Sequence, residues 1–166
     1  MRVAILTISD AGARGERPDT SGQVAAGWAE TRGYDVTARE LVPDETVQIV
    51  SALTAWCDND AADLVLTTGG TGLSPRDVTP EATRAVLERD APGIAERIRV
   101  VSVESFPRAA LSRGLSGVRK KTLIINLPGS PGGVKDGLAA LDPIIDHAVA
   151  VLRADRLEHD VGPHAK

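Results

Sequence analysis

The stretch at residues 61–82, AADLVLTTGGTGLSPRDVTPEA, constrains the fold more than any other part of the chain. Three apolar residues at 64–66 are followed by two threonines at 67–68, and this run has the length of a buried parallel strand. Glycines follow at 69, 70 and 72, and glycine accepts a positive φ and lets the backbone approach a ligand closely. Thr79–Pro80–Glu81 then predicts a helix start, with Thr79 as the N-cap and Pro80 in the first helical position. The stretch therefore predicts a buried strand, a glycine loop and a helix.

The glycine loop is a candidate site for a phosphate group. Successive N–H groups in such a turn can converge on an anion, so Gly69, Gly70, Thr71 and Gly72 are candidate ligands of nucleotide phosphate. The loop matches no common phosphate motif: no Gly-Lys-Ser/Thr follows it, and the third glycine of a Gly-x-Gly-x-x-Gly pattern falls on Pro75. A tight strand-to-helix connection held by a salt bridge is the alternative that these residues leave open.

Two charged residues, Arg76 and Asp77, lie between the loop and the predicted helix. A carboxylate beside a phosphate is favourable mainly when a divalent cation lies between them, because two anions otherwise repel each other. Asp77 is therefore a candidate Mg²⁺ ligand, although it could also cap the helix or form an ion pair. Arg76 could attract an anionic substrate, and Thr79 lies close enough in sequence to join the binding site.

Apolar periodicity and turn residues predict an alternation of strands and helices along the chain. The expected strands lie at residues 3–8, 34–41, 64–68, 117–119 and 122–126. The expected helices lie at residues 20–32, 44–56 with Asp44 as a possible N-cap, 81–89, 93–103, 109–113 and 134–152, the last split by Pro143. Residues 11–19 are expected to be a loop. This alternation predicts a single-domain three-layer α/β/α sandwich with a mostly parallel sheet over residues 1–152, followed by a polar tail at 153–166.

Polar clusters follow four of the expected strands, and all four clusters lie at one edge of the predicted sheet. In open α/β sheets, ligands bind beyond the carboxyl ends of the parallel strands. The clusters found there are Ser9–Asp10, Pro43–Asp44, residues 69–77 and residues 128–133. Ser9 and Asp10, together with Asn126, Pro128, Gly129 and Ser130 near the last cluster, are therefore candidate binding residues.

Composition narrows the function classes. The chain has 166 residues, 42% of them hydrophobic, which suits one globular domain. A net charge of −4 and an aromatic content of 2% argue against a general nucleic-acid binder. No apolar run reaches the roughly 18 residues of a membrane span, and a single cysteine, Cys57, excludes an internal disulfide. A cytoplasmic protein is expected, and no histidine or cysteine pattern indicates a zinc site or a hydrolase.

Four motifs carry a resemblance to a known family. The segment TTGGTGLSPRDVTPEAT at residues 67–83 resembles the signature of the molybdenum-cofactor biosynthesis domain family. Within that family the chain is similar to the Mog type, which includes the gephyrin G domain. The segments LTISD at 6–10, VPDE at 42–45 and IINLPGSP at 124–131 match in the same order. The likeness extends from Arg2 to about Leu152.

The resemblance implies a molybdopterin adenylyltransferase, which transfers AMP from Mg-ATP to the terminal phosphate of molybdopterin and releases pyrophosphate. It implies that Asp44 and Asp77 are the catalytic carboxylates, with a tentative role in holding Mg²⁺, and that the nucleotide lies against residues 126–130. It also implies a homotrimer, with a hexamer as the alternative, and a molybdenum insertase as a partner.

Two other functions are open. A family member of the MoaB type could bind the pterin or assemble with a partner without transferring AMP, or the domain could act as an oligomerising scaffold. Asp44, Asp77 and the complete RDVTPE segment favour the enzyme.

Overall fold

The computed structural model describes residues 1–154, so the predicted tail lies outside the described part except for its first two residues. Its sheet has six strands in the order β2-β1-β3-β6-β5-β4. The strands have the following bounds: β1 Arg2–Ile8, β2 Asp35–Val42, β3 Leu64–Thr68, β4 Arg89–Asp90, β5 Ser116–Arg119 and β6 Thr122–Leu127. The helices have the following bounds: α1 Asp10–Ala13, α2 Thr20–Thr31, α3 Thr46–Asp58, α4 Thr79–Val86, α5 Pro92–Ser105, the 3₁₀ helix η1 Pro107–Leu111, α6 Pro131–Leu141 and α7 Ile145–Arg153.

The predicted mostly parallel sheet is confirmed. Strand β1 lies between β2 and β3 and is parallel to both, and β3 is parallel to β6. Strands β5 and β4 extend the sheet antiparallel beyond β6. The carboxyl ends of four parallel strands therefore meet at one edge of the sheet.

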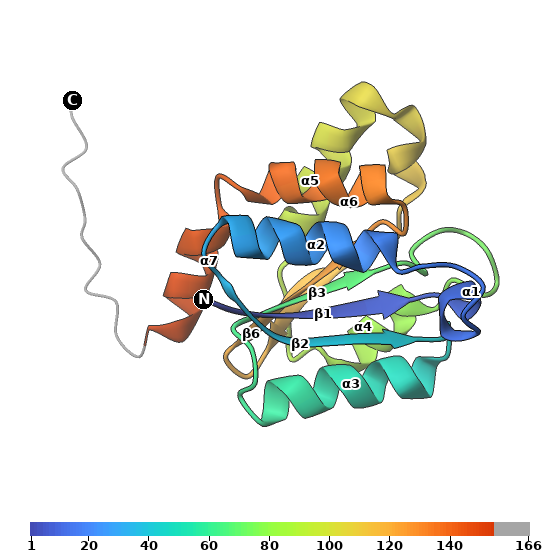
Figure 1. The fold of residues 1–166 in the computed structure, drawn as a ribbon. Helices are drawn as coiled ribbons and strands as arrows, with labels where there is room; N and C mark the ends of the chain where they lie inside the picture. The colour runs from blue at the N-terminus through green and yellow to red at the C-terminus, as the bar shows by residue number, and fades with distance from the viewer. Residues whose placement is uncertain (155–166) are drawn as a thin grey trace.

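Helices cover both faces of the sheet, which confirms the three-layer prediction. Alternate residues of each strand face opposite layers. Val3 and Ile5 of β1 pack with α2, α5, α6 and α7, whereas Ala4 and Leu6 pack with α3 and α4. Figure 1 shows α2 and α6 above the sheet and α3 below it. Because both faces are covered, the central strands read as continuous apolar runs rather than as alternating ones.

Several predicted boundaries were wrong. Asp44 does not cap α3, because Glu45 is the N-cap and the Asp44 carboxylate accepts a hydrogen bond from the Asp10 N–H instead. Thr79 is the first residue of α4 rather than its N-cap, and its hydroxyl donates to the Gly69 carbonyl oxygen. In both cases, an oxygen expected to cap a helix instead forms a hydrogen bond that joins two connections at the carboxyl edge of the sheet.

Three other segments differ from expectation. The loop predicted at residues 11–19 begins with the short helix α1, whose first turn is capped by Ser9. The helix predicted at 81–89 ends at Val86, because Arg89–Asp90 pair with β5 as an edge strand. The helix expected at 109–113 is the 3₁₀ turn η1. Pro143 does split the last helix into α6 and α7, as predicted.

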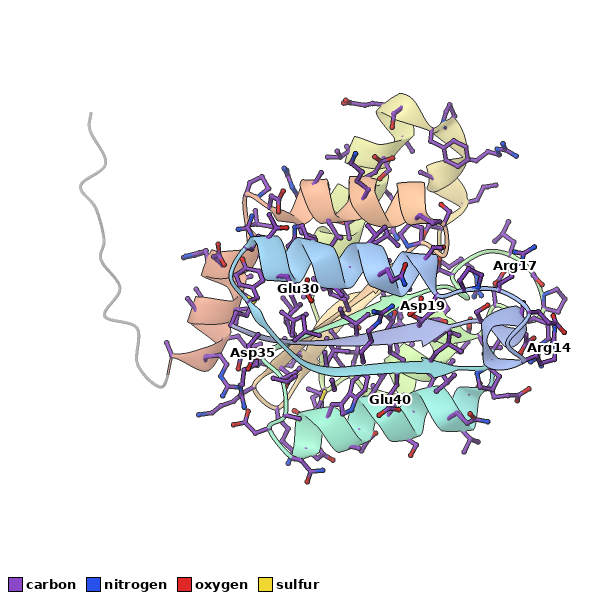
Figure 2. All side chains as sticks on the ribbon, viewed as in Figure 1. Arg14, Arg17, Asp19, Glu30, Asp35 and Glu40 are labelled. Atoms are coloured by element: carbon purple, nitrogen blue, oxygen red, sulfur yellow. The ribbon has the colours of Figure 1, made fainter. Side chains whose placement is uncertain are left out.

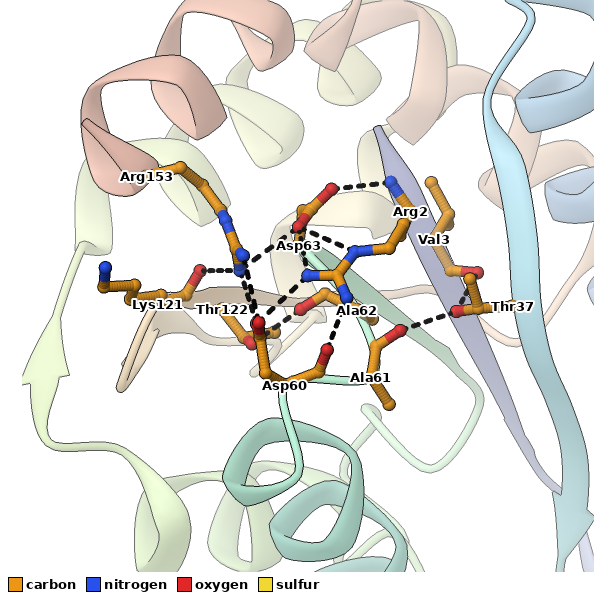
Figure 3. Close-up of polar contacts among 10 residues, drawn as sticks. All are labelled: Arg2, Val3, Thr37, Asp60, Ala61, Ala62, Asp63, Lys121, Thr122 and Arg153. Carbon is orange, nitrogen blue, oxygen red and sulfur yellow. Dashed lines mark hydrogen bonds and ion pairs between the residues drawn. The ribbon is translucent and has the colours of Figure 1, made fainter. Parts of the chain in front are cut away.

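An ion-pair network closes the amino-terminal end of the sheet (Figure 3). The Arg2 Nη2 atom lies 3.0 Å from Asp60 Oδ1 and 2.8 Å from Asp63 Oδ1. Arg153, the last residue of α7, lies 2.7 Å from Asp60 Oδ1. The network thus joins β1, the connection before β3 and the end of α7. None of the helices within residues 1–154 combines the length and apolar character needed to cross a membrane.

Candidate functional site

The glycine loop after β3 has a backbone that only glycine adopts readily. Gly69 has a φ of +104° and Gly70 a φ of +62°, in the left-handed region that disfavours other residues. A Cβ on Gly69 would collide with the Ile8 carbonyl oxygen, and one on Gly70 would collide with the Thr79 hydroxyl and lie 2.9 Å from Asp44 Oδ1. The loop therefore lies directly against the end of β1 and against Asp44.

Backbone and side-chain hydrogen bonds fix the carbonyl groups of this loop. The Thr79 N–H donates to the Gly70 carbonyl oxygen at 3.1 Å. Arg113 donates from its backbone to Thr71 at 2.9 Å and from Nε to the Gly72 carbonyl oxygen at 2.7 Å. The carbonyl groups of the loop are thus occupied by hydrogen bonds. The N–H groups of Gly70, Thr71 and Gly72, in contrast, have no protein acceptor among residues 1–154. Free N–H groups in a left-handed turn are suited to bind an anion.

Arg113 is a site residue that the sequence did not reveal. Its Nη2 atom donates to the Asp77 carbonyl oxygen at 2.6 Å, and its guanidinium also pairs with Glu81. It therefore clamps the glycine loop, Asp77 and the start of α4 together. Arg113 lies between η1 and β5, far along the chain from the loop, and no local pattern marks it.

A cavity of about 490 Å³ opens at this edge of the sheet. Seven of the predicted site residues line it: Ser9, Asp44, Gly69, Gly70, Asp77, Gly129 and Ser130. The structure thus brings together residues from the ends of β1, β2, β3 and β6, as the sheet topology predicts.

A second cavity of about 640 Å³ adjoins the first. Its lining includes Thr71, Gly72 and Pro128 from the predicted set, and residues of α5, η1 and α6. The two cavities share Gly70, Asp77, Gly129 and Ser130. A molecule in one cavity and a molecule in the other would meet at these four residues.

The two candidate catalytic carboxylates each keep one oxygen atom open. Asp44 Oδ2 accepts from the Asp10 N–H at 2.8 Å, while Oδ1 faces Gly70. Asp77 Oδ2 accepts from the Ser74 N–H at 2.8 Å. Burial raises the pKa of Asp44, and the neighbouring charges of Asp10 and Asp77 raise it further, although the Asp10 N–H opposes the change. Both carboxylates therefore lie on the wall of the first cavity with an oxygen available to a ligand.

Asp10 and Arg76 are bound mainly to each other. Arg76 Nε and Nη2 lie 3.0 Å from the two Asp10 oxygens, and Nη2 also lies 2.9 Å from Glu45 Oε1. The hydrogen bond from Arg76 lowers the pKa of Asp10. Neither residue lines either cavity. The pair braces the end of β1 against the loop before Asp77.

Asn126 and Thr79 also lie beneath the site rather than in it. The buried Asn126 amide accepts from the Leu115 N–H at 3.0 Å and donates to the hydroxyls of Thr67 and Thr83, both at 2.9 Å. Neither Asn126 nor Thr79 lines a cavity. Asn126 instead ties β6 to β3 and α4 below the glycine loop.

The start of α2 contributes cavity residues that the sequence prediction left out. Arg17, Asp19, Thr20 and Ser21 line the first cavity. The Asp19 carboxylate is occupied, since it caps α2 and accepts from Thr7 and Arg39. Arg17 is exposed at this end of the molecule (Figure 2) and forms no hydrogen bond or ion pair with residues 1–154. The rule that ligands bind at strand carboxyl ends could have identified Arg17, which lies between β1 and α2.

Comparison with known proteins identifies the family. A family model described as "Probable molybdopterin binding domain" matches residues 4–147. The chain belongs to this family.

Relatives in this family include both enzymes and longer proteins. A molybdopterin adenylyltransferase of Helicobacter pylori strain J99 is 36% identical over 160 residues, which are 95% of this chain and 91% of that protein. The molybdenum cofactor synthesis protein cinnamon of Drosophila melanogaster is 41% identical over 152 residues. That match covers 91% of this chain and 25% of cinnamon, so the chain spans about a quarter of that relative's length.

A solved structure agrees with the fold. The crystal structure of the molybdopterin biosynthesis enzyme MoaB from Thermus thermophilus matches with a TM-score of 0.86 and 51% identity. The match covers 91% of this chain and 95% of the MoaB chain. The predicted α/β fold and its assignment to the family are therefore confirmed.

The site fits a Mg²⁺ ion that binds together with phosphate, rather than a metal held by the protein alone. Within residues 1–154, no group of three or more His, Cys, Asp or Glu side chains forms a metal-binding cluster. Mg²⁺ is usually bound by one or two carboxylates plus substrate phosphates and water. The open oxygens of Asp44 and Asp77 beside the glycine loop match that donor set.

Proposed function

We propose that this protein is a molybdopterin adenylyltransferase, which joins AMP from ATP to the terminal phosphate of molybdopterin. Membership of the family and the names of its relatives support this activity. The observation that carries the proposal is the meeting of two cavities at Gly70, Asp77, Gly129 and Ser130. A reaction between two phosphate-bearing substrates needs two adjacent cavities, placed so that the phosphate groups of the two substrates meet where the cavities join.

In the reaction, an oxygen of the molybdopterin phosphate attacks the α-phosphorus of ATP. A new P–O bond forms, the bond between the α-phosphorus and the bridging oxygen breaks, and pyrophosphate leaves. The attacking phosphate is already ionised near neutral pH, so the protein needs no strong general base. Its task is to position two polyanions and to stabilise the developing charge.

The chain supplies this stabilisation through the glycine loop. The N–H groups of Gly70, Thr71 and Gly72 have no protein acceptor among residues 1–154, and Gly70 borders both cavities. These dipoles are preorganised, because the loop carbonyls are held by Thr79 and Arg113. Fixed donors aimed at developing negative charge are an effective form of electrostatic catalysis. Arg17 adds a positive charge to the first cavity.

Asp44 and Asp77 would hold Mg²⁺ through their open oxygens. When bound, Mg²⁺ would neutralise part of the phosphate charge of the substrates. Asp10 keeps Asp44 in place by a reciprocal pair of hydrogen bonds of 2.8 and 3.1 Å. The Ser74 N–H donates to the Asp77 carboxylate and Arg113 donates to its backbone carbonyl oxygen, so both position Asp77.

The alternative is a protein of the MoaB type that binds molybdopterin without transferring AMP. A pyrophosphate-release assay on the purified protein with molybdopterin and Mg-ATP separates the two functions. The proposed enzyme releases pyrophosphate only when both substrates are present. Tight binding of molybdopterin with no pyrophosphate would reject the transferase and leave the binding module.

Three expectations complete the proposal, two from the resemblance and one, the location, from composition. The protein acts as a homotrimer, with a hexamer as the alternative, and its adenylylated product passes to a molybdenum insertase. Its location is the cytoplasm.

A further inference from the structure

One stretch of the chain gives the first cavity a polar wall that the second cavity does not share. Residues 17–20, from the connection before α2 and the first residue of that helix, line the first cavity alone. The wall of the second cavity instead includes Phe106 and Leu111, whose apolar side chains are 49% and 53% exposed. The two cavities therefore differ in the kind of chemical group that they can accept.

Arg17 is the one basic side chain on the wall of the first cavity among residues 1–154. It is exposed and forms no hydrogen bond or ion pair within this part of the chain. Arg14, three residues earlier, is paired with Glu16, since its Nε atom lies 2.7 Å from Glu16 Oε1. Figure 2 shows both arginines at the same end of the molecule. Arg17 thus has a full positive charge available to a ligand.

The carboxylate next to Arg17 in the sequence is already compensated. Arg39 Nη2 lies 2.7 Å from Asp19 Oδ2. Asp19 Oδ1 accepts from the Thr7 hydroxyl at 2.9 Å and from the Gly22 N–H at 2.8 Å. Asp19 therefore does not need Arg17 as a partner, and its charge is largely offset for an anion entering the cavity.

Thr20, the first residue of α2, adds a second donor beside Arg17. It is exposed on the cavity wall, and its hydroxyl forms no hydrogen bond with residues 1–154. Because α2 has 12 residues, its first turn also carries a partial positive charge. A guanidinium, a hydroxyl and a helix N-terminus are together suited to the oxygens of a phosphate group.

The geometry of phosphoryl transfer decides which phosphate reaches this wall. The attacking and leaving oxygens lie roughly in line on opposite sides of the phosphorus. With the α-phosphorus where the two cavities join, attack from one cavity directs the leaving pyrophosphate into the other. Pyrophosphate has no apolar surface, so it fits the wall at Arg17 and Thr20 better than the wall at Phe106 and Leu111.

We infer that Arg17 and Thr20 bind the β- and γ-phosphates of ATP and hold the pyrophosphate as it leaves into the first cavity. The bond between the α-phosphorus and the bridging oxygen breaks, and its electron pair stays on that oxygen as part of the pyrophosphate. Arg17 then distinguishes a triphosphate from a monophosphate of the same nucleoside. The inference rests on the proposed function for the identity of ATP, whereas the position of the pyrophosphate follows from the cavity walls.

The test is the affinity of Arg17→Gln for ATP, AMP and pyrophosphate, measured by calorimetry with Mg²⁺ present. Losing a charge-assisted contact weakens the binding of ATP and of pyrophosphate about 5- to 20-fold. The affinity for AMP stays unchanged, because AMP lacks the β- and γ-phosphates. The melting temperature stays unchanged as well, since the Arg17 side chain has no hydrogen bond or ion pair within residues 1–154 to lose. In turnover, the KM for ATP rises while the KM for molybdopterin does not.

Arg14→Gln is the matched control, because it removes the same charge from the same connection and Arg14 lines neither cavity. An equal loss of affinity in Arg14→Gln would overturn the inference, since the effect would then reflect net charge alone. Unchanged affinities of Arg17→Gln for ATP and pyrophosphate would also overturn it, as would no binding of pyrophosphate to the wild-type protein. The expected binding pattern without any pyrophosphate release would reject the proposed function and support the phosphate site.

Discussion

The two ends of the sheet both gather charged residues, but they differ in how completely these residues are paired. At the amino-terminal end, Arg2 and Arg153 pair with Asp60 and Asp63 in one network (Figure 3). At the carboxyl-terminal end, Asp44 and Asp77 accept hydrogen bonds from backbone N–H groups and keep an oxygen free beside a cavity.

This difference separates stability from function. A paired network holds segments that are distant in sequence and has little left to offer a ligand. Open carboxylate oxygens and N–H groups without a protein acceptor hold little of the fold together, and their arrangement is useful only when a ligand completes it. Neutralising a carboxylate should therefore affect mainly stability at the amino-terminal end and mainly activity at the carboxyl-terminal end.

The largest effect on both properties is expected from Gly70→Ala. The substitution places a Cβ against Thr79 and Asp44 at a φ of +62°. We expect a loss of about 2–3 kcal/mol in the free energy of unfolding and a fall in the transfer rate on the order of 100-fold, because the loop and Asp44 shift.

The control for Gly70→Ala is Gly33→Ala. Gly33 has a φ of +72°, and a Cβ there would meet no atom within 4 Å. This variant is expected to lose about 1–2 kcal/mol from backbone strain alone and to keep its activity. Urea unfolding and pyrophosphate release measure both variants. Equal effects on activity in the two variants would contradict the close fit of the loop.

A smaller effect is expected from Arg113→Met, which removes hydrogen bonds to the carbonyl groups of Gly72 and Asp77. We expect about a 10-fold fall in the transfer rate because Asp77 loses its support, together with a loss of about 1–2 kcal/mol in stability. The control is Arg119→Met, since Arg119 also binds a carboxylate, Asp58, and a carbonyl oxygen, that of Val86. A similar loss of activity in both variants would show that Arg113 has no particular role at the site.

The smallest effect is expected from Asp60→Asn, and it should affect stability alone. Hydrogen bonds from Arg153 and Arg2 lower the pKa of Asp60 to about 2. The carboxylate therefore contributes stability above its unfolded pKa of about 3.9, and this contribution is lost as the pH falls from about 4 through about 2. Asp60→Asn should flatten the fall in melting temperature over this range, whereas Asp35→Asn, an exposed control, should not. An unchanged pH profile in Asp60→Asn would show that the network is not stabilising.

The order of the parallel strands and of the helices between them could be predicted from the sequence, because β1, β3 and β6 are largely apolar runs bounded by turn residues. The two-residue strand β4 has no such pattern and was missed. The convergence of Ser9, Asp44, Asp77 and Ser130 follows from the parallel topology alone. The order of elements depends on local sequence pattern, and the position of the site depends on the rule that ligands bind at the carboxyl ends of parallel strands.

The details of the site depend on contacts that no local pattern records. Thr79 fits an N-cap pattern, but its hydroxyl donates to Gly69 across the loop. Arg113 reaches the loop from a segment more than 30 residues away in sequence. Asn126 and Asp10 were predicted to bind substrate, whereas the structure places them in hydrogen bonds that support the cavity wall.

The most direct test of the account is the rate of pyrophosphate release by Asp77→Asn and Asp60→Asn, each measured beside its melting temperature. Asparagine can still accept the hydrogen bond from Ser74, so Asp77→Asn changes the charge with little change in shape. The account predicts that Asp77→Asn lowers the rate at least about 100-fold with an unchanged melting temperature, and that Asp60→Asn keeps the wild-type rate. Full activity in Asp77→Asn would contradict the assignment of function to the carboxyl end of the sheet.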